Sequence, residues 1–261
     1  MSRKPAEHEG ITHLSGDVTK PETIEAAVNA VLEREDHIDI LVNNAGFGIS
    51  GAIEFTEPEE ARKQMEVNFF GMVNVCHAVL PHMREAGHGR IVNLSSVAAP
   101  IAIPFQAFYS ASKAAINAYS QALANEVRPY GVTVCAVMPG DIRTGFTAAR
   151  KKVQLPTGVA GVSPAVMEVR YPCCTTTKMF PSYKEESEIA YPHAEHAVAA
   201  MERDEQHGLT PQAMARSLYH IATARYPRPQ YIGGAEYRLF AFLHWLLPQR
   251  LVNYIVGRIY A

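Results

Sequence analysis

The sequence predicts an α/β fold in which helices cover both faces of a parallel β-sheet. Short apolar runs alternate along the chain with longer segments whose apolar residues recur at helical spacing. The apolar runs at 38–42 and 132–137 both stop at turn-forming residues, as buried parallel strands do. This alternation is typical of βαβ units.

The elements follow one another in chain order. The segment 21–35 carries Ile24, Val28 and Leu32 on one helical face, with Thr19 as the expected cap and Pro21 in the first turn. The remaining expected elements are a strand at 38–42, a helix over about 58–83, a strand at 90–94, a helix over about 106–127, a strand at 132–137, helices over about 185–204 and 211–223, and a strand at 230–232.

We expect the 261 residues to form one domain, 1–261. The stretch 144–206 begins with a loop rich in Gly and Pro that is too long for a simple connection, and we interpret it as a substrate lid. The segment 236–261 forms a C-terminal tail rich in Leu, Phe, Trp and Tyr.

Composition excludes several classes of function. The net charge of −2, with acids and bases scattered along the chain, gives no footprint for nucleic acid or for an anionic membrane surface. No apolar run is long enough for a secretory signal or a membrane span. The four cysteines show no zinc or redox spacing, and we interpret His193 and His196 as surface residues. These features predict a soluble, cytoplasmic protein without a metal site.

Tyr109 and Lys113 are four residues apart on an expected helix, so their side chains share one face. A nearby ammonium group favours the phenolate and lowers the pKa of a tyrosine, which can then exchange a proton with a carbonyl or alcohol oxygen. Taken alone, the pair also fits a solvated helical contact. Ser96 follows the strand at 90–94, where its hydroxyl can bind a substrate oxygen, although a turn serine is the simpler interpretation.

These residues belong to a pattern that resembles the classical short-chain dehydrogenase/reductase family over nearly all of the chain from Arg3 onward. Ser96 lies 13 residues before Tyr109, and Asn68 lies 28 residues before Ser96, as is usual in that family. The matching motifs are Asn43-Asn44-Ala45-Gly46, Val67-Asn68 with Gly71, Asn93-Leu94-Ser95-Ser96, Tyr109-Ser110-Ala111-Ser112-Lys113 and Pro139-Gly140-Asp141-Ile142-Arg143-Thr144.

The resemblance implies a role for each catalytic residue. Tyr109 is the acid/base, and Lys113 holds the nicotinamide ribose and lowers the pKa of the tyrosine. Ser96 orients the carbonyl or alcohol, and Asn68 holds a water through the helix backbone.

The resemblance also implies a set of cofactor-binding residues that extends beyond Tyr109 and Lys113. Asp17 and Val18 flank the adenine, Asn44, Ala45 and Gly46 pass the riboses, and Ile142 and Thr144 contact the carboxamide end of the nicotinamide. The full set is Arg3, Asp17, Val18, Asn44, Ala45, Gly46, Tyr109, Lys113, Pro139, Gly140, Ile142 and Thr144. Singly, Asp17, Gly46, Asn68 and Gly140 also fit ordinary turn, cap or helix-surface residues.

The family's glycine-rich loop, T-G-x-x-x-G-x-G, is absent from the sequence. We therefore expect a doubly wound, Rossmann-type sheet that is N-terminally incomplete, in a chain that begins about 35 residues late relative to the family. Either the native chain continues upstream, which we favour because the chemistry-bearing residues are intact, or this is a natural fragment. On this alignment Arg3 lies beside the adenosine 2′-phosphate, which favours NADP(H) over NAD(H).

The sequence resembles most the hydroxysteroid and retinol dehydrogenase branch and related bacterial carbonyl reductases. The expected substrate is therefore a small apolar carbonyl or alcohol, steroid-like or lipid-like. The residues expected to line its pocket are Ile101, Ile103, Pro104, Phe105, Phe108, Phe146, Met179 and Phe180.

The tail at 237–247 can rest on a membrane surface or close over this pocket, although core or oligomer packing is the commoner use of such a segment. A homo-oligomer is expected. The alternative function is a truncated, non-catalytic fragment or interaction subunit with impaired cofactor binding.

Overall fold

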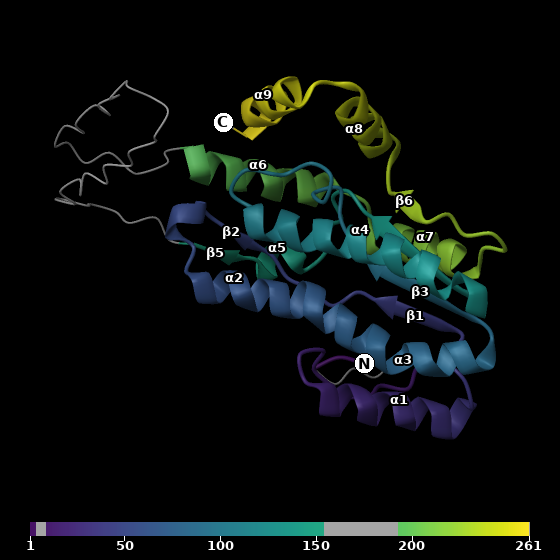
Figure 1. Ribbon diagram of the computed structural model, residues 1–261. Helices are drawn as coiled ribbons and strands as arrows, with labels where there is room; N and C mark the ends of the chain where they lie inside the picture. The colour runs from purple at the N-terminus through teal and green to yellow at the C-terminus, as the bar shows by residue number, and fades with distance from the viewer. Residues whose placement is uncertain (4–8, 154–192, 261) are drawn as a thin grey trace, which may run out of the picture.

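The computed structural model describes residues 1–3, 9–153 and 193–260, and it confirms a parallel sheet with helices on both faces (Figure 1). The main sheet has the order β1-β3-β4-β6, and all three pairings are parallel. Its strands are β1 (Ile40–Asn43), β3 (Gly89–Leu94), β4 (Val132–Met138) and β6 (Gln230–Ile232). The strands predicted from the apolar runs are therefore present to within two residues at each end.

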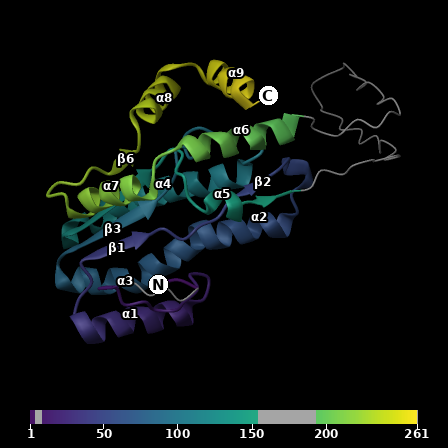
Figure 2. The ribbon, with the colours of Figure 1, turned by 180° about the vertical axis from the view of Figure 1, so that it is seen from behind.

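The core lies on both faces of β3 and β4. Ile91 points into a cluster with α1 (Pro21–Glu35), α3 (Gly71–Ala86) and α4 (Ala107–Val127), whereas Val92 points into a cluster with α7 (Pro211–Thr223). Figure 2 shows the sheet from the side of α7. Because successive strand residues face opposite ways, continuous Val and Ile runs supply both clusters.

One expected helix is divided in three. The segment predicted as a helix over 58–83 consists of α2 (Pro58–Met65), a π-helical turn over Glu66–Phe70 and α3. Hydropathic spacing does not reveal the π turn, because the apolar face continues through it. Such turns are frequent at functional sites, and this one contains the buried Asn68.

The amino-terminal residues lie outside the sheet. Ser2 and Ser15 form an isolated bridge, and within the described residues β1 is an edge strand whose Ile40 and Val42 are 41% and 42% exposed. Helix α1 has the predicted bounds, but Thr19 does not cap it. The hydroxyl of Thr19 donates to the Asp17 carboxylate instead, and Lys20 occupies the cap position.

The expected lid is described only in part. It contains α5 (Phe146–Ala149), β5 (Lys151–Lys152), which pairs with β2 (Ile49–Ser50), and α6 (His193–His207). Met179 and Phe180 lie outside the described residues. The tail forms α8 (Ala235–Leu246) and α9 (Gln249–Tyr260), and α9 packs on α6. The short 3-10 helices are η1 (Ile53–Phe55) and η3 (Arg128–Tyr130).

Two glycines make a matched pair for testing this fold. Gly87 and Gly131 have φ angles of 72° and 74°, but a Cβ on Gly87 would meet nothing within 4 Å, whereas one on Gly131 would lie 2.1 Å from the Gly87 carbonyl oxygen. We expect Gly87→Ala to lower the free energy of unfolding by about 1–2 kcal/mol, the cost of a left-handed non-glycine residue. Gly131→Ala should lower the free energy of unfolding clearly more, because the backbone at Gly87 must also move away from the new Cβ. Urea denaturation of the two variants measures both values, and equal losses would contradict the crowding at Gly131.

Candidate active site

The carboxyl end of β3 meets the first turns of α4. The Ser95 hydroxyl donates to the backbone carbonyl of Lys113 at 2.9 Å, which ties the strand end to the helix. The Ser96 Oγ accepts from the Ala98 N–H at 3.1 Å, and its side chain lies close enough to the phenol of Tyr109 to lower the pKa of that phenol. The Ser95 hydroxyl therefore makes a structural hydrogen bond, and Ser96 is the serine that faces Tyr109.

Lys113 is 6% exposed and lies beside Tyr109 on α4. Its Nζ lies 5.6 Å from the centre of the Tyr109 ring and donates to the Leu94 carbonyl at 2.7 Å. Burial lowers the pKa of Lys113 to about 8, because the charged ammonium loses hydration. The pair predicted from four-residue spacing lies at the end of β3 with Lys113 buried and Tyr109 partly buried, and it is not a solvated surface contact.

The pKa of Tyr109 differs in direction from the prediction. Burial raises this pKa to about 12, and the hydrogen bond from Ser96 and the charge of Arg150 only partly offset the burial and the negative charges of Glu205 and Asp141. The Lys113 ammonium, which donates to the Leu94 carbonyl, does not offset this rise. In this arrangement Tyr109 is a protonated acid at neutral pH.

Asn68 acts as a clamp on the loop that follows β1. Its Oδ1 accepts from the Phe47 N–H at 2.9 Å, and its Nδ2 donates to the Phe47 carbonyl at 3.0 Å and to the Ser112 Oγ at 3.1 Å. The side chain is 1% exposed, and the π turn places it between the loop and α4. The resemblance implied a water held by the backbone of Asn68; the structure adds that its side chain fixes this loop.

The loop contains the expected ribose-contacting residues Asn44, Ala45 and Gly46, all of them exposed. A Cβ on Gly46 would lie 3.2 Å from Asn68 Oδ1 and 3.7 Å from Lys113 Nζ. Gly46 therefore brings the loop backbone against the buried groups of the site, and a larger residue would crowd them.

The segment from Pro139 to Thr144 borders the site at the end of β4. The Val97 N–H donates to the Pro139 carbonyl at 3.1 Å, and the ring of Tyr237 covers Gly140 so closely that a Cβ there would lie 2.0 Å from it. The Tyr237 hydroxyl donates to the Asp141 carboxylate.

The two residues expected at the carboxamide end of the nicotinamide have different surroundings. Ile142 packs against the core cluster on the α7 side of the sheet, whereas Thr144 is exposed and its Oγ1 accepts from the Phe146 N–H at 3.2 Å.

The expected adenosine-binding residues lie beside α1 and α3. Asp17 accepts from the backbone N–H of Thr19 at 3.0 Å, and this bond, more than the charge of nearby Arg3, lowers the pKa of Asp17. Val18 packs against Gly71, and its carbonyl accepts from Asn74 at 3.2 Å. Arg3 is exposed.

An apolar cavity of about 480 Å³ adjoins the loop that follows Ser96, which contributes Val97, Ile101 and Ile103 to it. These three side chains form its wall on the loop side, and side chains of α8 and α9 form the other wall. Of the pocket residues predicted from sequence, Ile101 and Ile103 line this cavity. Phe146 instead contacts the Tyr109 ring at a centroid distance of 5.7 Å, and Pro104, Phe105 and Phe108 do not line it.

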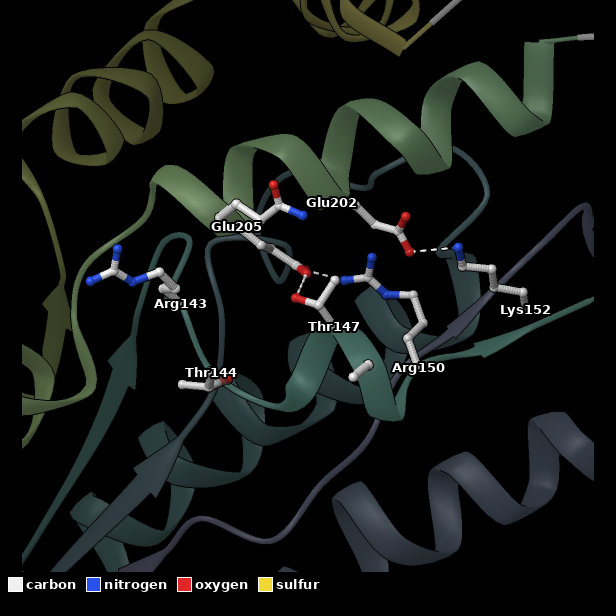
Figure 3. A pocket seen from close by; sticks show the side chains of 9 residues that line it. Arg143, Thr144, Thr147, Arg150, Lys152, Glu202 and Glu205 are labelled. Carbon is white, nitrogen blue, oxygen red and sulfur yellow. Dashed lines mark hydrogen bonds and ion pairs between the residues drawn. The ribbon is translucent and has the colours of Figure 1, made fainter.

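A second, polar cavity of about 410 Å³ lies beside Thr144 (Figure 3). Arg150 from the end of α5 and Glu205 from α6 form an ion pair in its wall, and the Thr147 hydroxyl donates to Glu205. Arg150 is 6% exposed, and its Nε and Nη1 have no hydrogen-bond partner among the described residues. No sequence pattern predicts this pair, because its members are 55 positions apart.

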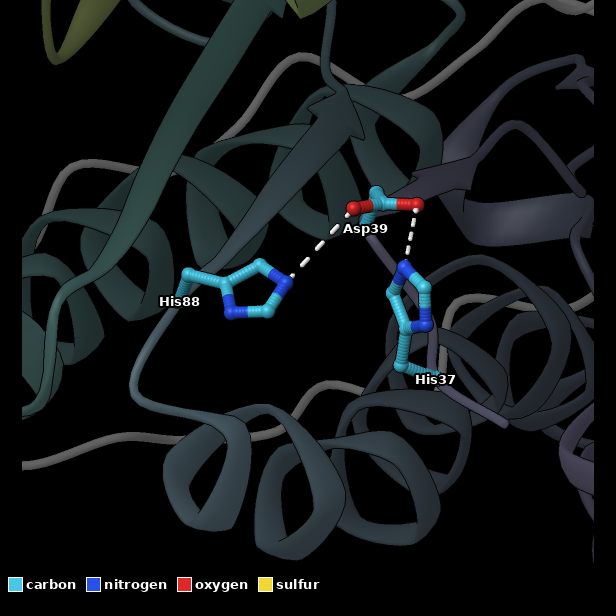
Figure 4. A group of neighbouring side chains, drawn as sticks. All are labelled: His37, Asp39 and His88. Carbon is cyan, nitrogen blue, oxygen red and sulfur yellow. Dashed lines mark ion pairs between the residues drawn. The ribbon is translucent and has the colours of Figure 1, made fainter. Parts of the chain in front are cut away.

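A cluster of His37, Asp39 and His88 lies at the opposite ends of the strands (Figure 4). The Asp39 carboxylate is 3.3 Å from His37 Nε2 and 3.6 Å from His88 Nε2. All three are exposed. Asp39 precedes β1 and His88 precedes β3, so the cluster is at the amino ends and takes no part in the chemistry at Ser96.

Sequence reasoning missed the buried polar network behind the site. Asn43 Nδ2 donates to Asn93 Oδ1 at 2.9 Å, and Asn93 Nδ2 donates to the Ser120 Oγ at 2.9 Å, so β1, β3 and α4 are joined by side chains. Gln64 adds a bond from its Nε2 to the Phe47 carbonyl at 3.0 Å. These residues could have been found in the sequence as polar side chains at positions where the spacing of apolar residues predicts the core.

Curated proteins similar to this chain are reductases and dehydrogenases. The chain is 49% identical over 155 residues to the 3-ketodihydrosphingosine reductase of Bacteroides thetaiotaomicron, a match that covers 59% of this chain and 58% of the relative. It is 38% identical over 143 residues to dehydrogenase/reductase SDR family member 7B of Mus musculus, covering 53% of this chain and 44% of that protein. The chain thus spans about half the length of these relatives.

Solved structures similar to this chain also include dehydrogenases. A short-chain dehydrogenase from Streptomyces avermitilis has a TM-score of 0.68 at 28% identity, over 88% of this chain and 73% of that one. A gluconate 5-dehydrogenase from Burkholderia cenocepacia in complex with NADP and tartrate has a TM-score of 0.51 at 34% identity, over 52% and 54%. The family model described as short chain dehydrogenase matches residues 2–154. The chain belongs to the short-chain dehydrogenase/reductase family.

Proposed function

We propose that this protein is an NAD(P)-dependent oxidoreductase that interconverts the carbonyl and the secondary alcohol of a lipid-like substrate. The observation that carries the proposal is the convergence of Ser96, Tyr109 and Lys113 at the carboxyl end of β3, beside the loop that holds Gly46. Active residues of open α/β sheets gather at this end of the strands.

In the direction of reduction, Tyr109 gives its phenolic proton to the carbonyl oxygen while Ser96 donates a hydrogen bond to the same oxygen. Lys113, whose Nζ lies 5.6 Å from the centre of the Tyr109 ring, is proposed to hold the nicotinamide ribose beside the tyrosine. Asn68 acts as a positioning residue through the Phe47 backbone. The nicotinamide, when bound, supplies a hydride to the carbonyl carbon.

The described residues fit the nicotinamide and its ribose. Exposed backbone at Asn44 to Gly46, the Lys113 ammonium and the segment from Pro139 to Thr144 border one region. Small residues in this loop permit close approach of a ribose. The glycine-rich pyrophosphate loop does not occur in the sequence. We propose a preference for NADP(H), supported by the exposed Arg3 near Asp17, whose positive charge suits a 2′-phosphate.

The substrate class follows from the apolar cavity. Its walls are mainly aliphatic and aromatic, and it adjoins Ser96 through Val97. The name of the Bacteroides relative specifies a long-chain amino ketone, 3-ketodihydrosphingosine. We propose a ketone of this kind, with its alkyl chain in the apolar cavity and its carbonyl against Tyr109.

The test is a comparison of a long-chain ketone with its short-chain homologue. The full chain is incubated with NADPH and either 3-ketodihydrosphingosine or a short homologue with the same head group, and oxidation of NADPH is followed by absorbance. We expect kcat/KM to be at least about tenfold higher for the long chain, because each buried methylene contributes about 0.8 kcal/mol. NADH in place of NADPH should give a higher KM.

Calorimetry with NADPH separates this proposal from the alternative of a non-catalytic subunit. Micromolar binding with turnover supports the enzyme, whereas no binding would contradict it and favour the interaction subunit. Turnover without a chain-length effect would leave the oxidoreductase standing and contradict the assignment of the apolar cavity.

A further inference from the structure

Helices α8 and α9 follow one another near the C-terminus (Figure 1). Their apolar side chains form two different faces. The inner face borders the apolar cavity. It consists of Phe240 and the aliphatic residues Leu243, Leu247, Val252, Ile255, Val256 and Ile259, and Glu236, Tyr237, His244 and Tyr260 line the cavity as well. The outer face, which we call the tail face, points away from the cavity, and its large apolar residues are Leu239, Phe242, Trp245, Leu246, Leu251 and Tyr254.

The tail face is continuous along each helix. On α8, Leu239, Phe242 and Leu246 are spaced by three and four residues, and on α9, Leu251 and Tyr254 are three residues apart; such spacings fall on one side of a helix. The side chains are strongly exposed: Phe242 by 53%, Trp245 by 79% and Tyr254 by 66%. An apolar surface of this extent on two adjacent helices marks an interaction site.

The charged residues of the segment 237–261 are all basic. From Tyr237 to Ala261 the sequence contains no Asp or Glu, and it carries Arg238, Arg250 and Arg258, all of which are exposed in the structure. Arg250 and Arg258 are four residues on either side of Tyr254, and Arg238 is four residues before Phe242. The arginines therefore border the apolar stripe. The whole-chain charge of −2 conceals this local excess of positive charge.

We propose that the tail face docks on an anionic lipid surface, with α8 and α9 lying in the plane of the interface. Trp and Tyr favour the headgroup level of a bilayer, and arginines beside an apolar stripe bind acidic headgroups. Among the described helices, none combines the length and apolarity that crossing a membrane requires.

A lipid surface fits the tail face better than a second copy of the chain does. In a twofold dimer the same patch meets itself, so the arginines of one copy would approach those of the other. Glu236, at the start of α8, is the one acidic residue in the two helices that could compensate them. Anionic headgroups supply that compensation directly.

Docking places the apolar cavity next to the lipid. Ile255 and Ile259 line the cavity and are also 40% and 51% exposed, so its wall extends to the surface beside the tail face. A long-chain substrate would then reach Ser96 from the bilayer without crossing water. This route depends on the proposed function, whereas the docking itself depends only on the tail face.

Trp245 reports on docking directly, because it is the single tryptophan of the chain. The full chain is mixed with vesicles of phosphatidylcholine alone, or of phosphatidylcholine with phosphatidylglycerol, and pelleting and tryptophan emission are measured. We expect co-pelleting and a blue shift of the emission with the anionic vesicles, and weaker binding in high salt, which screens the arginines.

Substitutions on the tail face test the assignment. Leu239→Glu with Phe242→Glu keeps Trp245 and should weaken vesicle binding at least tenfold, whereas Tyr219→Glu, on an exposed position of α7, should leave it unchanged. Leu239 and Phe242 do not line the cavity, so both variants should retain NADPH-dependent turnover of a short, water-soluble ketone. Loss of that turnover in all forms would count against the proposed function and not against docking.

Three outcomes would overturn the proposal. These are no binding to either type of vesicle, binding that the tail-face substitutions leave unaltered, and a blue shift that depends on protein concentration without lipid. The last, together with a dimer mass in analytical ultracentrifugation, would assign the tail face to a second copy.

Discussion

Replacement of Tyr109 by Phe is expected to lower kcat/KM for ketone reduction by about 10²- to 10⁴-fold, the usual contribution of a positioned general acid. The phenyl ring keeps the contact with Phe146 at 5.7 Å and removes only the hydroxyl that Ser96 faces. NADPH affinity should therefore change little. Stopped-flow or steady-state absorbance measures the loss, and calorimetry measures the binding.

A matched control is Tyr219→Phe, which removes a hydroxyl from an exposed tyrosine on α7 and should leave kcat/KM unchanged. If Tyr109→Phe retained near-normal reduction, the acid/base assignment would be wrong. A parallel loss of NADPH binding would instead indicate that the hydroxyl holds the cofactor.

Because the pKa of Tyr109 is raised, reduction and oxidation should depend on pH in different ways, and Tyr109→Phe tests this. With a pKa of about 12, the phenol stays protonated throughout the neutral range, so it is ready to donate during reduction. Alcohol oxidation needs the phenolate and should accelerate as pH rises. The wild-type kcat for oxidation should therefore rise with pH, and the residual oxidation by Tyr109→Phe should rise less steeply, because the variant has no phenol to deprotonate.

Much of the fold could be predicted from the sequence because local periodicity and tertiary packing agree there. Helices α1 and α7 have the predicted bounds, since their apolar faces begin after a proline and end where the spacing stops. The split at Glu66–Phe70 could not be predicted, because a π turn alters backbone pairing without altering the apolar face.

The site could be predicted as a set of residues but not as an electrostatic environment. Motif spacing identifies Tyr109 and Lys113, and the structure places them side by side at the end of β3. It does not reveal how far burial raises the pKa of Tyr109, to which the negative charge of Glu205 adds, or that the Leu94 carbonyl holds Lys113 Nζ. Both features arise from packing between elements far apart in the chain.

Replacement of Lys113 by Met is expected to abolish most of the activity and also to change how stability depends on pH. The folded protein lowers the pKa of Lys113 from 10.5 to about 8. Between these pH values the unfolded chain holds the proton and the folded protein does not, so this group makes the free energy of unfolding rise with pH. The slope is about 1.4 kcal/mol per pH unit, which amounts to about 3 kcal/mol over the interval.

Other buried groups oppose this trend, so the measurement must be a difference between proteins. Burial raises the pKa of Cys76 from 9.0 to about 12, and the unfolded chain therefore loses that proton first and gains stability relative to the folded protein as pH rises. Cys76 is present in both wild type and Lys113→Met, and its contribution cancels in the difference. The control Lys63→Met, at an exposed position on α2, removes a lysine whose side chain is already in water.

Denaturation by urea at a series of pH values measures the difference in unfolding free energy, Lys113→Met minus wild type. Below pH 8 the substitution raises the free energy of unfolding, because it removes a buried charge. At every pH it also lowers that free energy by a constant amount, because the Leu94 carbonyl loses its hydrogen-bond donor. The difference should therefore fall by about 3 kcal/mol between pH 8 and 10.5, because the wild-type penalty vanishes once this lysine is neutral in the unfolded chain as well. A difference that stays constant with pH would show that Lys113 keeps its charge in the folded protein, and that the hydrogen bond to Leu94 outweighs its burial.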